Sequence, residues 1–250
     1  MEVHHHTHHP KKWKEYFWEF FMLFLAVFCG FLAEIQVEHY VEHQREKQYM
    51  LSLVDDLESD TALLKEGFPR KDQRIIAIDS LLLFFETNPG AKAIPRNIFR
   101  LMGRSLWDRH YRRNNTTMTQ LKNAGGLRLI RKKNVRDSIA ALDLLWDRAD
   151  FFKELYFKTQ DRGKEFVQHI IQAEDAVSIY RRRPYFSPYR PAPDSVTIEN
   201  IRINRELLSP YLNFLSDQAN TTSQDKRTYE EIEKSAERLI ALIKKEYHLE

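Results

Sequence analysis

Residues 20–33 read FFMLFLAVFCGFLA, a stretch without a charged side chain. Mostly aromatic and aliphatic neighbours extend its apolar character to residues 16–35. An α-helix of about 20 residues is long enough to cross the hydrocarbon core of a bilayer. Glu19 and Glu34 fall near the two ends of this segment, at the depth of the headgroups. We therefore predict a transmembrane helix over residues 16–35.

Two other interpretations of this apolar segment stay open. It could be a buried core helix, because its uncharged part alone is short for a span. It could also be a signal peptide that is removed. No A-x-A cleavage motif follows the segment, and Phe28 before Cys29 does not fit a lipoprotein cleavage site. The sequence favours an uncleaved membrane anchor.

The charges that flank the segment predict its orientation. Lys11, Lys12 and Lys14 precede it, whereas acidic residues follow it until Arg45. Because positive charges stay on the cytoplasmic side, we expect residues 1–15 to form a cytoplasmic tail in a single-pass protein of the inner (cytoplasmic) membrane, with the rest in the periplasm. The single cysteine lies within the span, so an internal disulfide and a cysteine zinc site are excluded.

The predicted cytoplasmic tail is rich in histidine. Imidazoles at this density bind zinc, nickel or copper. A purification tag and a solvated tail are the alternative interpretations, and the interruption by Thr7 favours a natural tail. The candidate metal ligands are His4, His5, His6, His8 and His9.

Beyond the span the pattern is helical almost throughout. Apolar or small residues recur in alternating steps of four and three, which is a heptad stripe. They are Met50, Val54, Leu57, Thr61, Leu64 and Phe68. The equivalent positions nearer the membrane are mostly polar. We expect residues 36–66 to form a stalk helix that continues from the span and enters a bundle, with the stripe used for monomer packing or for self-association as a coiled coil.

Residues 67–250 are expected to form an extracytoplasmic helical domain. The predicted helices cover residues 70–87, 95–107, 116–123, 127–133, 135–180, 205–219 and 229–247, with a proline-rich crossover at 184–193. Gly125 and Gly126 mark a structural turn, where glycine permits positive φ or close approach of helices. No alternating run is long enough for a sheet. The predicted fold class is all-α: a single N-terminal transmembrane helix continuing into an extracytoplasmic antiparallel bundle.

The near-neutral total charge of +3 hides a polarised chain. Residues 34–66 hold nine acidic and three basic side chains, whereas residues 91–136 hold thirteen basic side chains against Asp108 alone. Outside the cytoplasm such a basic face suits an anionic ligand or an acidic partner better than nucleic acid, which we do not expect as a partner. The candidate binding residues are Arg96, Arg100, Arg104, Arg112, Arg113, Arg181, Arg182, Arg183 and Arg190.

Catalytic signatures are missing from the sequence. It has no phosphate-binding glycine loop, no HExxH and no GxSxG, and the pair His39 and His43 lies on a polar helix with no third ligand. With 12% aromatic residues and only seven glycines the chain is neither disordered nor collagen-like. We therefore predict a folded protein that is not an enzyme, with no catalytic residue and no cofactor.

Three segments resemble a family of small bacterial single-pass membrane proteins of unknown function. They are the opening MEVHHH, residues 119–139 (TQLKNAGGLRLIRKKNVRDSI) and the ending LIKKEYHLE. The resemblance implies a native histidine tail and a structural role for the turn at 121–129, but no reaction, cofactor or binding residue.

Two functions follow from these observations as expectations. The first is a membrane-anchored helical interaction or structural subunit, accessory to a bacterial envelope complex. The second is an extracytoplasmic sensor or binding module that holds an anionic ligand on residues 91–136 and 181–190. The expected partners are the lipid bilayer, other membrane or envelope proteins and a second copy of the chain.

Overall fold

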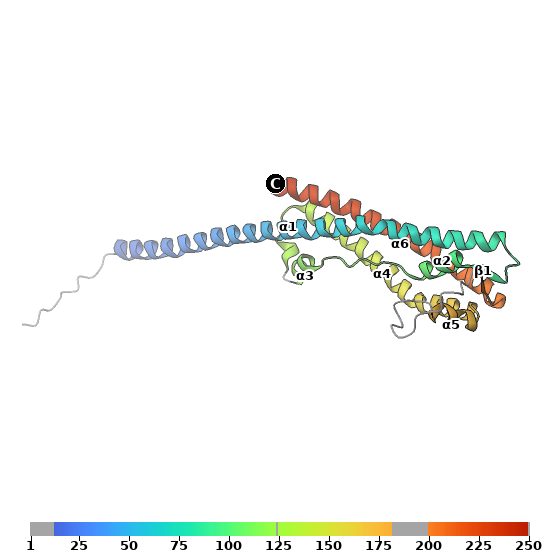
Figure 1. Ribbon diagram of the computed structural model, residues 1–250. Helices are drawn as coiled ribbons and strands as arrows, with labels where there is room; N and C mark the ends of the chain where they lie inside the picture. The colour runs from blue at the N-terminus through green and yellow to red at the C-terminus, as the bar shows by residue number, and fades with distance from the viewer. Residues whose placement is uncertain (1–12, 124, 182–199, 250) are drawn as a thin grey trace, which may run out of the picture.

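The computed structural model describes residues 13–123, 125–181 and 200–249. These residues are almost entirely helical, which confirms the all-α class (Figure 1). The helices are α1 (Trp13–Thr87), α2 (Arg96–Leu106), α3 (Thr116–Asn123), α4 (Lys133–Ile170), α5 (Ala173–Arg181) and α6 (Leu208–Tyr247). Two 3-10 turns, η1 (Gly126–Arg128) and η2 (Arg205–Leu207), and two strands, β1 (Ala93–Pro95) and β2 (Asn200–Arg202), complete the described chain.

Helix α1 is continuous through 75 residues. The expected break after residue 66, with a new helix at 70–87, is wrong, because α1 runs on through Pro69. Proline removes the hydrogen bond to the carbonyl of Lys65. Both residues are exposed, so water can solvate that carbonyl, while Leu64 and Lys71 on the opposite side are buried and hold the helix against its neighbours.

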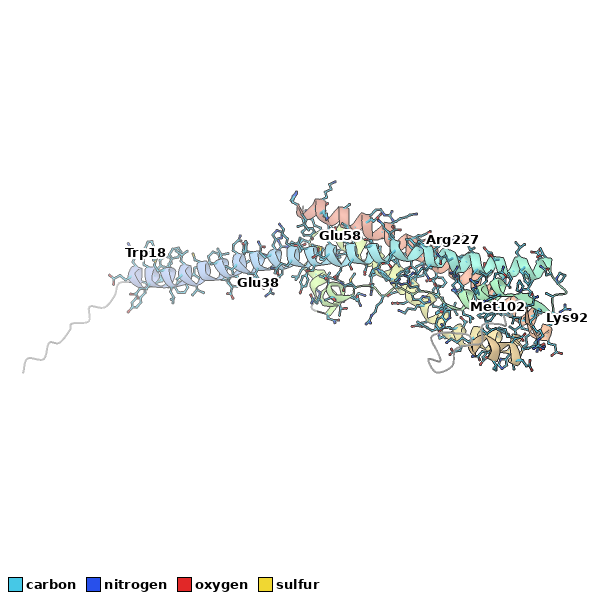
Figure 2. The ribbon with its side chains drawn as sticks, in the orientation of Figure 1. Trp18, Glu38, Glu58, Lys92, Met102 and Arg227 are labelled. Atoms are coloured by element: carbon cyan, nitrogen blue, oxygen red, sulfur yellow. The ribbon has the colours of Figure 1, made fainter. Side chains whose placement is uncertain are left out.

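The two parts of α1 have different surroundings. Among the described helices, α1 is the one long and apolar enough to cross a membrane. The apolar stretch of α1 that would do so has no buried residue. Side chains near Trp18 and Glu38 stand clear of the other elements, whereas Glu58 lies beside the rest of the domain (Figure 2). Burial begins at Glu46 and continues to Phe85. One helix therefore links an unpacked apolar segment to the core of a folded domain.

Helices α1, α6 and α4 form the body of the domain. As residue numbers rise along α1, those of their partners fall along α6: Glu46 bonds Tyr247, Lys65 bonds Glu237 and Arg74 bonds Gln218. The pairs between α4 and α6 run in the same sense, from Asn134–Glu246 to Thr159–Gln218. Helix α6 is thus antiparallel to both α1 and α4, and α1 and α4 point the same way (Figure 1).

Two apolar cores lie one after the other along these helices. The proximal core, on the side nearer the apolar segment, is built around Met50, Leu121, Ile139, Trp146 and Leu239. The distal core is built around Ile78, Leu81, Ile94, Met102 and Tyr211. The heptad stripe is part of the proximal core, since Met50, Val54, Leu57 and Leu64 are buried within the single chain. Self-association through this stripe would require the domain to open.

Several helix boundaries differ from the sequence predictions. The segment 127–133 is mostly not helical: η1 ends at Arg128 and α4 begins at Lys133. The helix expected over 135–180 stops at Ile170 rather than pausing at Gly163, because Ile171 is extended and pairs with Ile203. Gly163 stays helical and lets Phe214 of α6 approach closely. The proline-rich crossover lies outside the described residues.

Two further corrections concern α6 and the strands. The gap expected between residues 219 and 229 does not exist, because the polar residues there, including Thr222 and Asp225, face the interior as part of one continuous helix. The strands β1 and β2 form an antiparallel ribbon in which the buried Ile94 and Ile201 are paired. Strands of three residues are too short to show an alternating pattern in the sequence.

The predicted glycine turn joins α3 to α4. Gly125 has a φ of +66°, a left-handed conformation that glycine adopts without steric cost. A β-carbon on Gly126 would lie 3.1 Å from the backbone of Leu121, which is fully buried. The turn thus packs η1 tightly against α3.

Candidate functional site: a buried charged cluster

A layer of charged residues separates the two apolar cores. Lys71 and Arg74 come from α1, Asp108 and His110 from the segment between α2 and α3, and Asp225 from α6. All five side chains are at least nine-tenths buried, and Lys71 is completely inaccessible. We call these five residues the buried charged cluster. It connects three parts of the chain that are far apart in the sequence.

Lys71 is the centre of this cluster. Its Nζ donates to Oδ2 of Asp225 at 2.5 Å and to both carboxylate oxygens of Asp108 at 3.1 Å. The rings of Tyr229 and Tyr111 lie 5.1 and 5.9 Å from the same nitrogen and add cation–π contacts. The ammonium group is therefore held by two carboxylates and two aromatic faces.

Arg74 satisfies its guanidinium with four acceptors. Nε donates to the carbonyl of Ser105 at 3.0 Å. The terminal nitrogens donate to Asp108 Oδ2 at 3.0 Å, to Thr222 Oγ1 at 2.5 Å and to Gln218 Oε1 at 2.9 Å. Buried charges cost several kcal/mol each unless they are paired and hydrogen-bonded, and Arg74 meets both conditions.

The two carboxyl groups respond differently to burial. Burial tends to raise the pKa of Asp108, but Lys71 and Arg74 outweigh it and hold that pKa below its ordinary value. For Asp225 burial dominates over the attraction of Lys71, and its pKa is raised. Two carboxylates face Lys71 and Arg74, so the cluster is neutral overall when all four groups are ionised.

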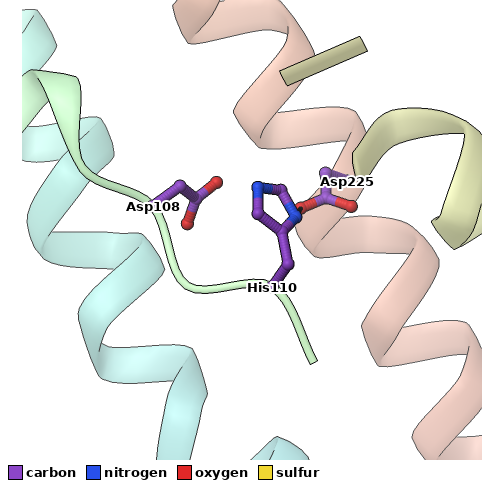
Figure 3. Close-up of side chains that lie close together, drawn as sticks. All are labelled: Asp108, His110 and Asp225. Atoms are coloured by element: carbon purple, nitrogen blue, oxygen red, sulfur yellow. Dashed lines mark ion pairs between the residues drawn. The ribbon is translucent and has the colours of Figure 1, made fainter. Parts of the chain in front are cut away.

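His110 is the one member without a hydrogen bond from or to its ring within the described chain. Its Nδ1 lies 3.9 Å from Asp225 Oδ2, too far for a hydrogen bond (Figure 3). The ring packs on Tyr156 with centroids 4.4 Å apart. Burial, assisted by Lys71 and Arg74, lowers the pKa of His110 to about 4. The imidazole is neutral at physiological pH.

The positions of Asp108, His110 and Asp225 could suit a metal ion, because one ligand atom from each lies within 4.8 Å of the others. Asp and His are common ligands of divalent transition metals. However, the Lys71 ammonium already bonds to both carboxylates. A divalent ion would have to displace this cation or add two charges to a neutral buried cluster. The arrangement is better suited to joining α1, α6 and the intervening segment than to holding a metal.

Among the binding residues predicted from the sequence, those that the structure describes do not form one site. Arg96, Arg100 and Arg104 are exposed along one face of α2 and have no ion-pair partner in the described parts of the chain. Arg112 is also exposed, but Arg113 pairs with Asp143 at 2.7 Å. The side chain of Arg181, together with Arg182, Arg183 and Arg190, lies outside what the structure describes. The same holds for His4, His5, His6, His8 and His9.

Sequence reasoning missed the buried charged cluster, although a signal was present. The steps of three and four that define the heptad stripe continue past Leu64 through Lys71, Arg74 and Ile78. On α6, Asp225 holds the equivalent place before Tyr229 and Ile232. A charged residue within an apolar heptad stripe indicates a buried partner of opposite charge.

Compared with known proteins, the chain matches no family model, no curated protein and no solved structure. The interpretation of the cluster therefore rests on its geometry. The side chains of the cluster are at least nine-tenths buried, its two cations balance its two carboxylates, and hydrogen bonds join Lys71 to Asp108 and Asp225 and Arg74 to Asp108.

Proposed function

We propose that the chain is a membrane-anchored structural or interaction subunit. The observation that carries this proposal is the continuity of α1, whose exposed apolar part and buried domain part are one helix. Exposed apolar surface on this scale is costly in water and favourable in lipid. The helix would hold an antiparallel helical domain at a set distance from the bilayer.

The proposed location is the inner membrane, with residues 1–15 in the cytoplasm and the domain in the periplasm. Support comes from the lysines before the span and the acidic stalk after it. Residues 36–45 of that stalk are almost all exposed. A partner among envelope proteins would meet the domain beyond this stalk.

We propose no catalytic role. Within the buried charged cluster Lys71 is inaccessible and bonds to both carboxylates, and His110 is buried without a hydrogen bond to its ring. A substrate could reach these groups only if the elements packed around them separated. The cluster instead specifies how the two helices align, a role for which buried polar groups are well suited.

Two measurements test the proposal. Mild detergent extraction of the full chain, followed by mass spectrometry, should yield a stoichiometric set of membrane or envelope proteins. In a Cys29→Ser background, a membrane-impermeant maleimide added to cells with a permeabilised outer membrane should label Gln224→Cys, which is exposed on α6, and spare Thr7→Cys in the tail. Labelling of Thr7→Cys alone would indicate the opposite orientation, with the tail outside the cytoplasm. Recovery of the chain without partners would contradict the subunit role.

A second candidate function, an anionic-ligand sensor, is favoured by one observation. Arg96, Arg100 and Arg104 follow one another at i, i+4 and i+8 on an exposed face of α2, without ion-pair partners among described residues. A ligand bound there should raise the melting temperature of the full chain, and Arg100→Glu with Arg104→Glu should abolish the rise. An interaction subunit without a ligand would show no such shift.

A further inference from the structure

The fold divides the basic region 91–136 into two separate surfaces. The arginines of α2 lie beside the distal core, because Met102 of the same helix belongs to it. Five further cations lie at the opposite end of the domain, where η1 leads into α4 (Figure 1). We call this second group the proximal basic end; it consists of Arg128, Arg131, Lys132, Lys133 and Arg136.

Contacts with α1 place the proximal basic end beside the stalk. The backbone N–H of Arg131 donates to Glu46 Oε1 at 2.8 Å, and its guanidinium lies 3.5 Å from Glu42. Leu129 lines a groove of about 630 Å³ together with Ala33 and Val37. These two residues bracket residue 35, the end of the proposed span.

The depth of these contacts follows from helix geometry. Glu42 is seven residues beyond residue 35, which is about 10 Å along a helix. The headgroup region on each side of a bilayer is roughly 5–8 Å thick. The proximal basic end would therefore lie within a Debye length, about 8 Å, of the phosphate layer.

The direction of α4 adds to the positive potential there. Helices α1 and α4 point the same way, so the N-terminus of α4 faces the apolar end of α1 (Figure 1). Its first turn contains no acidic residue, and its N-cap, Lys132, makes no side-chain capping hydrogen bond. Helix N-termini carry a partial positive charge and normally attract acidic groups. Cations gathered at this end leave a site that an external anion would stabilise.

Not all cations of the proximal basic end are neutralised within the chain. Lys132 pairs with Glu246 at 3.3 Å and Lys133 with Asp137 at 2.8 Å. Arg128 and Arg136 are exposed and have no ion-pair partner in the parts that the structure describes. The stalk residues Glu34 and Glu38 line the groove beside Leu129, so a phosphate is favoured on the α4 side.

We infer that the proximal basic end binds the phosphates of anionic lipid headgroups and holds the helical domain against the bilayer surface. The inference rests on the proposed membrane-spanning role of α1. It commits to lipid as the partner because the site lies within a Debye length of the phosphate layer and combines apolar Leu129 with unpaired cations.

The test uses the full chain in detergent, titrated with phosphatidylglycerol and followed by native mass spectrometry. Each basic residue near an anionic surface strengthens binding roughly fivefold, so loss of two cations weakens binding roughly thirtyfold, and the reversed pair Arg128→Glu with Arg136→Glu should weaken it by more than that. The matched control, Arg100→Glu with Arg104→Glu, makes the same charge change on α2 and should leave the affinity unchanged. Binding of wild type should also fall as salt is raised.

Circular dichroism checks that each variant is folded, and Arg128→Gln with Arg136→Gln replaces the reversed pair if that pair is not. Equal weakening by both charge-reversed pairs, no weakening by either, or full competition by millimolar inorganic phosphate would overturn the inference. Carbonate extraction of native membranes separates this outcome from the underlying proposal. If wild type leaves the membrane in carbonate, the spanning role fails; if it stays but the variants bind lipid normally, only the docking surface fails.

Discussion

Replacement of Lys71 by methionine tests whether the buried charged cluster is a balanced unit. The variant keeps a long unbranched side chain but leaves two buried carboxylates against Arg74 alone. Removing one partner of a buried ion pair costs about 3–5 kcal/mol, because the remaining charge is uncompensated. Both carboxylates lie within 3.1 Å of the Lys71 nitrogen and are almost inaccessible, so we expect a cost in this range.

The double variant Lys71→Met with Asp225→Asn is the informative one. It removes one charge of each sign and leaves the Arg74–Asp108 pair intact, so it should cost about 3 kcal/mol less than the sum of the two single changes. The assay is urea unfolding of the full chain in detergent, followed by circular dichroism and by the fluorescence of buried Trp146. Additive losses, with no recovery in the double variant, would refute the charge-balance argument.

An exposed ion pair provides the matched control for this cycle. Arg148 of α4 pairs with Glu231 of α6, and about half of each side chain is exposed. The pair joins helices in the same body, but solvent screens it. Removing either partner or both should change the free energy of unfolding by less than about 1 kcal/mol.

Three further predictions concern packing and pH. A β-carbon on Gly67 would lie 1.6 Å from the Tyr111 hydroxyl, so Gly67→Ala should destabilise the domain by about 1–3 kcal/mol in the same urea assay. A β-carbon on Gly103 would have no atom within 4 Å, so the control Gly103→Ala should stabilise the domain by up to about 1 kcal/mol. Equal effects of the two substitutions would contradict the packing argument. Burial raises the pKa of Asp60 from 3.8 to about 6, so its contribution to stability is present below about pH 4 and lost as pH rises through 6. At pH 7 the free energy of unfolding of Asp60→Asn should exceed that of wild type by up to about 3 kcal/mol. The same difference between the two proteins at pH 4 would contradict this prediction. Burial lowers the pKa of His110 to about 4, so its contribution to stability is present above about pH 6.5 and lost as pH falls towards 4. His110→Gln should therefore lose up to about 3 kcal/mol less free energy of unfolding than wild type over this pH range. The same loss in both proteins would exclude His110 as the cause of acid destabilisation.

The sequence predicted the parts of the fold that depend on local pattern. The heptad stripe follows from spacing, because an amphipathic helix shows its buried face in its periodicity. The apolar segment follows from the length of its uncharged run, and the end of α3 from the glycine pair after it. It predicted helix ends less well. The expected break between residues 66 and 70 does not occur, because around Pro69 the packing of its neighbours outweighs the loss of one hydrogen bond on the exposed side.

The buried charged cluster could not be assembled from the sequence alone. Lys71 and Asp225 are 154 residues apart, and nothing local to either indicates the other. Asp108 was counted as the sole acidic residue of a basic face, whereas it lies inside the domain between two cations. Asp108 therefore neutralises none of the exposed cations of residues 91–136, several of which pair with acidic residues elsewhere in the chain.

The unbroken α1 gives the molecule a mechanical property. From residue 35 to Thr87 the helix is about 80 Å long. If its apolar part spans a bilayer, both packed cores and the layer between them would move with α1 as one rigid body. A change of about 10° in tilt at the membrane would then displace the far end of α1 sideways by about 14 Å. Tilt responds to the match between apolar length and bilayer thickness. A small change in membrane thickness would thus reappear, magnified, as a lateral displacement of the distal core.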